Sequence, residues 1–175
     1  MLTKLRRMWR AKDGLAAVEF AFLAPVMLLM FFGTVELSAA LDCRARVNTV
    51  ASTAADLVAQ ETSVSSSDMA NVFAALNSII YPYSTTPAKI VISSLTYSTS
   101  TTGIVAWSDA QNATARTVGS SVTVPTGLMS SGGSVILAEI TYTYSSPTTQ
   151  FLTNAVTMTN TFYERPRRSA TVTHT

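Results

Sequence analysis

The sequence predicts an α+β protein in which a long N-terminal helix spans a membrane with its first half and packs its second half on a small antiparallel β-sheet. Three observations predict this fold. Residues 15–41 are almost wholly apolar, and residues 42–61 continue with apolar side chains spaced three and four positions apart. After Pro87 the apolar residues alternate, which is typical of strands. The chain therefore divides into a membrane anchor and one modest domain.

The composition indicates an exported, membrane-anchored protein. Of the 175 residues, 47% are hydrophobic and only 13% are charged, whereas soluble domains average about 25% charged. Basic residues predominate in residues 1–14, and from Asp42 onward the two signs balance, so the net charge of +2 belongs to the flank of the membrane segment. Nothing in this distribution indicates a nucleic-acid surface. The single cysteine, Cys43, excludes an intramolecular disulfide and a cysteine-based zinc site.

The apolar segment 15–41 is long enough to cross a bilayer, because as a helix it spans about 40 Å. Pro25 is expected to kink it by removing one backbone hydrogen bond. A cleaved secretory signal peptide is the first alternative, but its apolar region is normally about 7–15 residues long. Here the helical pattern instead runs on through residues 42–61 as an amphipathic continuation.

A polar break at residues 62–67 opens the remaining domain, which we place at residues 62–165. The apolar spacing predicts a second helix over Asp68–Tyr81, which the following proline ends. Ser66 or Ser67 is expected to provide its N-cap.

The strands are predicted from alternation and from turn residues. A hairpin comes first, then a polar loop that contains a short strand, then the clearest strand of the chain. The next segment is compatible with either a short helix or a loop. An edge strand and a flexible tail are predicted after it. In chain order these segments are Lys89–Ser98 and Gly103–Asp109, the loop 110–133 with Val118–Val124, Ser134–Ser145, Phe151–Met158, Asn160–Arg165 and residues 166–175.

The junction between the basic flank and the apolar segment carries a specific motif. The sequence from Lys12 reads KDGLAAVEFAFLAP, in which a glycine precedes an apolar helix that has an acid at its fifth position and an aromatic at its sixth. This segment resembles the N-terminus of the TadE-like pseudopilins and minor pilins of Tad (Flp, type IVb) pilus systems. Pro25 and the segment Gly33-Thr-Val-Glu36 also fit that family, and the late strand ITYTY and the segment FYERPR agree more loosely.

The resemblance implies a processing site and an assembly role. In the family, a prepilin peptidase cleaves after the glycine, here Gly14, so that Leu15 becomes the first residue and Glu19 and Phe20 the fifth and sixth. It also implies a pilin-like fold and a single pass through the bacterial inner membrane, with a cytoplasmic N-terminus and a periplasmic domain, alone or incorporated in a pilus. The implied partners are the peptidase, other pilins and pseudopilins, and pilus platform proteins.

The two acids of the apolar helix have separate expectations. A charged Glu at the centre of a membrane helix costs about 2.5–3.5 kcal/mol on insertion scales, so Glu19 is expected to have a partner. Cleavage after Gly14 would create one, the amine of Leu15 on an adjacent subunit. Glu36 could pair with Arg44 or with a neighbouring subunit, and we favour a solvated position at the membrane boundary.

No set of residues indicates catalysis, a metal site or a cofactor. The single histidine, His174, is one residue from the end, which argues against a His-dependent triad. Cys43 could cross-link helices, but a small unreactive apolar role is favoured. We expect strand aromatics to be core or half-buried and the basic C-terminus to be solvated; the residues concerned are Trp107, Tyr142, Tyr144, Arg165, Arg167 and Arg168.

Three other interpretations remain open at this point. The chain could be a plain signal-anchor protein with Gly14 as a linker and Glu19 as an interfacial carboxylate. It could be an uncleaved, membrane-anchored periplasmic scaffold of the same or another secretion system. An exported hydrolase is the third, and the near absence of histidine argues against its common forms.

Overall fold

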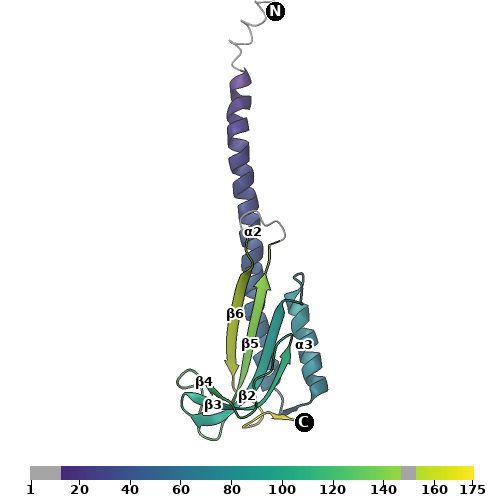
Figure 1. Cartoon of the computed structure of the whole chain (residues 1–175), viewed down its shortest axis with the longest axis vertical. Helices are drawn as coiled ribbons and strands as arrows, with labels where there is room; N and C mark the ends of the chain where they lie inside the picture. The colour runs from purple at the N-terminus through teal and green to yellow at the C-terminus, as the bar shows by residue number, and fades with distance from the viewer. Residues whose placement is uncertain (1–12, 147–152) are drawn as a thin grey trace, which may run out of the picture.

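The computed structural model describes residues 13–146 and 153–175, with side chains in the first helix from Ala16 onward, and it has the expected α+β fold. The described part contains a long helix, a shorter one, a curled antiparallel sheet of five strands and a small sheet of two short strands (Figure 1). The predicted leader, apart from Asp13 and Gly14, lies outside these residues.

Helix α2 (Asp13–Ala59) is one continuous element of 47 residues, which corresponds to about 70 Å. Pro25 lies inside this helix and does not interrupt it. Its first half stands free of the domain, and its second half lies along the sheet (Figure 1). The single helix expected over residues 15–61 is confirmed to within two residues at each end, because the apolar spacing continues across the junction.

Helix α3 (Ser66–Ile80) confirms the second predicted helix, but it begins two residues before the expected Asp68. Its N-cap is Ser65, not Ser66 or Ser67. The Ser65 hydroxyl accepts a hydrogen bond from the Asp68 amide at 3.2 Å, and an Asp68 carboxylate oxygen accepts from the Ser65 amide at 2.9 Å. This reciprocal capping box needs an acid three residues after the cap, and only Ser65 has one at that distance.

The five-stranded sheet has the order β4-β3-β2-β5-β6, and every neighbouring pair is antiparallel. The predicted hairpin, short strand and long strand are confirmed. The strands are β2 (Ala88–Thr99), β3 (Thr102–Gln111), β4 (Ser121–Thr123), β5 (Ser134–Tyr144) and β6 (Val156–Glu164).

Strand β6 corrects the prediction for residues 151–158, which were expected to be a short helix or a loop. The first two of these residues lie outside the described part, but residues 156–158 are already in the edge strand. Met158 is opposite Tyr142 in the ladder, and its side chain is buried in the core under α2. This contact with β5 decides the conformation, and the local sequence does not contain it.

The alternation along β5 places side chains in two apolar clusters. Ile136, Ile140 and Tyr142 face the large core, which α2 and α3 cover. Val135 and Leu137 face a smaller core on the other side of the sheet. Register shifts in the β2–β3 ladder, after Ser94 and again after Tyr97, accompany the curl that closes this second core.

The C-terminal residues are docked, so the expected flexible tail from Pro166 is wrong. Strand β7 (Thr173–His174) pairs in parallel with β1 (Ser63–Val64), and the Arg167 amide donates to the Ala59 carbonyl at 2.9 Å. Val172 is only 2% exposed, and its carbonyl accepts from Trp107 Nε1 at 2.7 Å. The same contacts show that the polar break at residues 62–67 contains a strand.

Candidate functional site

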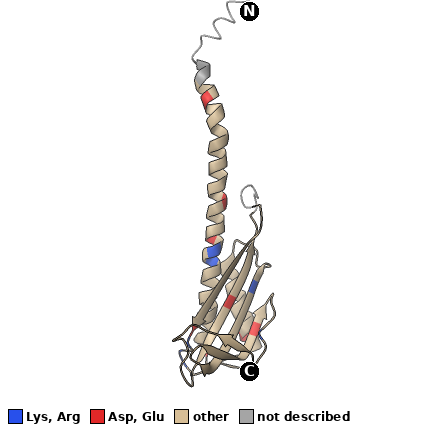
Figure 2. Cartoon of the chain, turned by 60° about the vertical axis from the view of Figure 1, so that its left-hand side comes forward, with Lys and Arg blue, Asp and Glu red and all other residues tan. Residues whose placement is uncertain are grey.

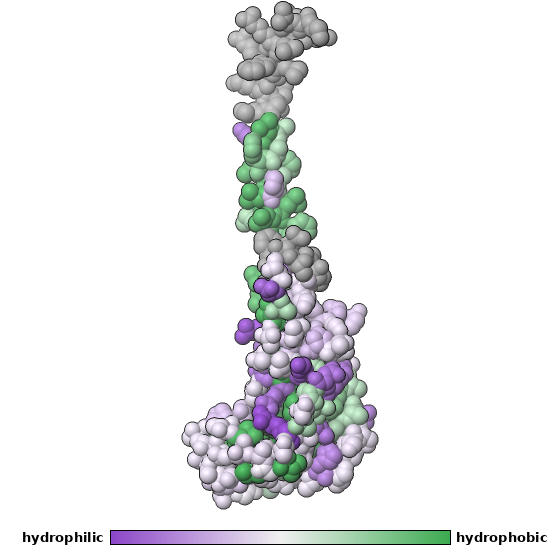
Figure 3. All heavy atoms as spheres, in the orientation of Figure 1, coloured by the Kyte–Doolittle hydropathy of each residue, from purple (hydrophilic) through white to green (hydrophobic). Residues whose placement is uncertain are grey.

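The free half of α2 presents an apolar surface on all sides. Its large apolar side chains from Val18 to Leu41 are 46–76% exposed, and they form the hydrophobic stalk in Figure 3. The helix from Ala16 is long and apolar enough to cross a membrane, with a mean hydropathy of 2.0 in its best window. So large an exposed apolar surface is typical of a segment that lies in lipid or against other helices. It fits a single-pass membrane anchor.

The residues of the predicted processing motif lie at the free end of this stalk. Gly14 and Leu15 are in the first helical turn, and Glu19 and Phe20 follow one turn later with exposed side chains. Pro25 is exposed farther along. The part of α2 that carries these residues stands clear of the domain (Figure 1). No described residue forms a hydrogen bond or an ion pair with Glu19.

Glu36 differs from Glu19 because it is only 3% exposed. The expected solvated position at the membrane boundary is therefore wrong. Glu36 lies where the stalk reaches the domain, near Tyr144 at the end of β5. Burial, the neighbouring Cys43 and Glu36 raise the pKa of the Tyr144 hydroxyl, while Ser146 opposes the shift. The helical pattern alone could not show this burial, because the nearby Tyr144 belongs to a strand far along the chain.

A second cluster, which the sequence reading missed, fastens the stalk to the domain. The Tyr83 hydroxyl lies 2.8 Å from the Ala39 carbonyl and 3.0 Å from an Asp42 carboxylate oxygen. Arg46 Nε donates to Asp42 at 2.9 Å, and Arg46 Nη1 donates to the carbonyls of Ile79 and Tyr81. We call Ala39, Asp42, Arg46, Tyr81 and Tyr83 the stalk clamp. Part of the stalk clamp could have been predicted from the sequence, because an acid at position 42 and a base at position 46 are spaced to pair on one face of a helix.

The contacts of the stalk clamp shift the protonation equilibria of its members. Hydrogen bonds from Arg46 and then Tyr83 lower the pKa of the Asp42 carboxyl. Burial and then Asp42 raise the pKa of Tyr83 to about 12. Burial also raises the pKa of the adjacent Cys43 thiol to about 11, and Cys43 is 1% exposed. A buried neutral thiol is unreactive, which agrees with the favoured apolar role of Cys43.

Two further polar pairs of the domain join distant parts of the chain. Charges are sparse on the molecule (Figure 2). His174 Nε2 lies 2.9 Å from an Asp109 carboxylate oxygen, and its ring is tilted by 52° against the Trp107 ring, with the centroids 5.5 Å apart. Arg116 binds both carboxylate oxygens of Glu139 at 2.7 Å, in a hollow of about 550 Å³ on the outer face of the sheet.

The three C-terminal arginines are exposed, as expected for a solvated basic end, but two of them also contact the domain. Arg165 donates to the carbonyls of Gly127 and Leu128. Arg167 lies 2.6 Å from an Asp56 carboxylate oxygen. The predicted burial of Trp107, Tyr142 and Tyr144 is confirmed. Within residues 13–146 and 153–175, no three His, Cys, Asp or Glu side chains are arranged to hold a metal ion.

Comparison with known families gives one match. Residues 14–56 match the family model described as TadE-like protein, a segment that starts at Gly14 and ends within α2. Neither a curated protein nor a solved structure gives a significant match. The resemblance predicted from the Gly14 motif is therefore confirmed over about a quarter of the chain, and it relates this protein to Tad pilus systems.

Proposed function

We propose that this chain, whose anchor helix is TadE-like, is a minor pilin or pseudopilin that is trimmed after Gly14 and takes part in assembling a Tad-type pilus. The observation that carries the proposal is Glu19, an exposed carboxylate on the free apolar stalk, fifth in the chain counted from Leu15. The family is structural, so the proposed work is assembly and not catalysis.

The proposed mechanism follows from the cost of that carboxylate. A charged group in the apolar layer is unfavourable until it finds an opposite charge. Removal of residues 1–14 would leave the Leu15 amine at the end of an apolar helix. Side-by-side packing of two such helices would let Glu19 of one subunit neutralise that amine on the next. Glu19 also lies in the first turns of its own helix, where the helix dipole favours negative charge.

The proposed location follows from the same helix. The basic leader favours a cytoplasmic N-terminus, which leaves residues 42–175 in the periplasm of a cell with an inner membrane. The partners would be a prepilin peptidase, other pilins or pseudopilins, and the platform proteins of the pilus.

Intact mass after incubation with a matched prepilin peptidase tests the processing step. We expect a loss that equals residues 1–14. Gly14→Val should block it, because a branched side chain would obstruct the scissile position. Gly33→Val is the control, since it changes a glycine inside the stalk and should leave cleavage intact. Wild-type protein that keeps its full mass would overturn processing.

Glu19→Ala separates a filament subunit from the uncleaved scaffold. We expect the variant to insert in membranes at the wild-type level but to be lost from sheared pilus fractions by at least tenfold. Val18→Ala changes the adjacent exposed residue and should leave incorporation unchanged. Normal incorporation of the Glu19 variant would contradict the charge-pairing mechanism.

A further inference from the structure

We propose that the end of the domain next to the stalk rests on the lipid headgroups of the membrane, with Tyr81 as its anchor in that layer. The partner is a bilayer surface with phosphate headgroups. The inference needs only that the stalk spans a membrane, and it is independent of processing and of pilus assembly.

The first step is the position of the membrane boundary. Exposed large apolar side chains continue along α2 as far as Leu41, and Asp42 and Arg44 follow with exposed side chains. The domain already covers one side of the helix at Glu36, but large apolar side chains stay exposed on the other side as far as Leu41. We therefore place the end of the hydrocarbon layer near Leu41 on that exposed side, since charged groups beyond it need water or headgroups. The headgroup layer then covers roughly the next 5–8 Å, which is half the difference between the full bilayer and its core.

The second step is the level at which the stalk clamp holds Tyr81. Arg46 donates to the Tyr81 carbonyl, and the Tyr83 hydroxyl reaches Ala39, which lies within the apolar segment. From Leu41 to Arg46 the helix rises by about 7.5 Å. The clamp therefore fixes the C-terminal end of α3 at the depth of the headgroups.

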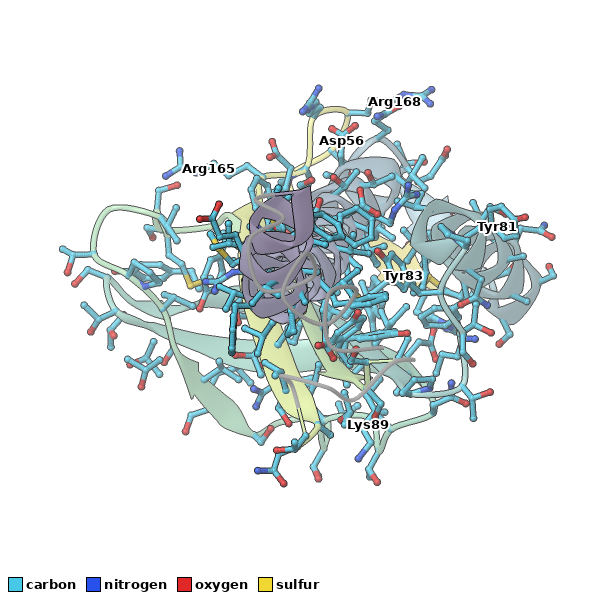
Figure 4. All side chains as sticks on the ribbon, turned by 90° about the horizontal axis from the view of Figure 1, so that it is seen from above. Asp56, Tyr81, Tyr83, Lys89, Arg165 and Arg168 are labelled. Atoms are coloured by element: carbon cyan, nitrogen blue, oxygen red, sulfur yellow. The ribbon has the colours of Figure 1, made fainter. Side chains whose placement is uncertain are left out.

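The third step is the chemistry presented there. Tyr81 is 75% exposed, more than any other large apolar side chain in the described part of residues 42–175. Figure 4, which looks along the stalk, shows Tyr81 directed outward from the end of α3, while Tyr83 lies between α3 and the stalk. A tyrosine has an apolar ring and a polar tip, and such side chains are enriched at the membrane–water boundary.

The charges at this level agree with a phosphate-bearing surface. Arg46 is paired with Asp42, which leaves the exposed Arg44 as a cation one turn or less beyond the boundary. Basic residues next to a membrane segment gain about 1 kcal/mol each near anionic lipid. A stalk in the bilayer and a tyrosine at its surface would hold the domain at two points and so fix its tilt.

Nitroxide accessibility in lipid nanodiscs tests this proposal on the full chain. Tyr81→Cys carries the label, and Ser100→Cys is the matched control. Ser100 is exposed in the turn after β2, and twelve residues of strand, about 40 Å, separate that turn from the start of β2 near the stalk. The buried Cys43 should not react, and unsubstituted protein checks this.

The readout is the ratio of relaxation by oxygen, which partitions into lipid, to relaxation by a water-soluble nickel chelate. We expect the ratio at position 81 to exceed that at position 100 by at least threefold, and Arg44→Gln to lower it in discs that contain anionic lipid. Equal ratios at the two positions would overturn the proposal. So would a label at 81 that is shielded from both reagents, since that result would indicate contact with protein. The discs contain no pilus component, so failure here leaves the proposed function untouched.

Discussion

The Tyr83 hydroxyl lies 2.8 Å from the carbonyl oxygen of Ala39, which joins the segment between α3 and β2 to a helical turn at the end of the apolar stalk. The same hydroxyl is 3.0 Å from the Asp42 carboxylate. Side-chain hydroxyls often accept or donate within their own helix or loop, but these contacts bridge more than forty residues. They attach the segment after α3 to the stalk just beyond Glu36, where the stalk reaches the domain.

Removing this hydroxyl should weaken the attachment measurably. Tyr83→Phe is expected to lower the free energy of unfolding by about 1 kcal/mol, the usual net value of one hydrogen bond. The loss should appear in thermal melts of the full chain in detergent, followed by near-ultraviolet circular dichroism. Tyr81→Phe is the control, because Tyr81 contributes its backbone carbonyl to the clamp and its ring is exposed. Equal melting of both variants would contradict a role for the Tyr83 hydroxyl.

Acid should release the clamp through Asp42. The folded pKa of this carboxyl is lowered, first by Arg46 and then by Tyr83, from its ordinary value of 3.8. Its contribution is therefore fully present above that value and is lost as the pH falls through the lower folded pKa. We expect the melting temperatures of wild type and Asp42→Asn to differ at pH 6 and to converge as the pH falls well below 3.8. A difference that persists unchanged at pH 2 would exclude Asp42 as its source.

The docked C-terminus should open when its buried hydrogen bond is removed. Trp107→Phe deletes the donor that binds the Val172 carbonyl at 2.7 Å, and an unsatisfied buried acceptor costs about 1–3 kcal/mol. We expect faster hydrogen exchange at the amides of Thr173 and Thr175, which donate to Thr62 and Val64. The Met69 amide in α3 serves as the internal control. Rapid exchange at Thr173 and Thr175 already in the wild type would instead support a flexible tail.

The Arg116–Glu139 pair should make a small, salt-sensitive contribution to stability. Both side chains are about one-third exposed, but the geometry is bidentate, so we expect a coupling energy of about 0.5–1 kcal/mol. The measurement is a double-mutant cycle of Arg116→Met and Glu139→Gln at low and high salt. A coupling energy of zero at low salt would show that solvent already screens the pair.

The elements that could be predicted correctly are those whose pattern lies within one short stretch of the sequence. The apolar spacing specified α2, and the alternating side chains of β5 specified both faces of the sheet. The Gly14 motif identified the TadE-like segment because its information lies within a few consecutive residues.

The features that the sequence did not reveal depend on contacts between distant residues. Glu36 is buried close to Tyr144 of β5, and residues 166–175 are held by Trp107 and by the end of α2. Met158 belongs to a strand because Tyr142 lies opposite it. The stalk clamp joins position 39 to position 83. No periodicity within one segment reports on such contacts, so a single sequence could not place them.

The continuity of helix α2 has a geometric consequence. Because one helix carries both the apolar stalk and the domain, the direction in which the domain faces is set by the number of residues between them. One residue added near Phe32 would turn the whole domain by about 100° relative to residues 15–31 and move it by about 1.5 Å. Seven added residues would restore the facing to within about 20°. The number of residues between the stalk and the domain therefore determines which side of the domain faces a neighbouring protein in the membrane.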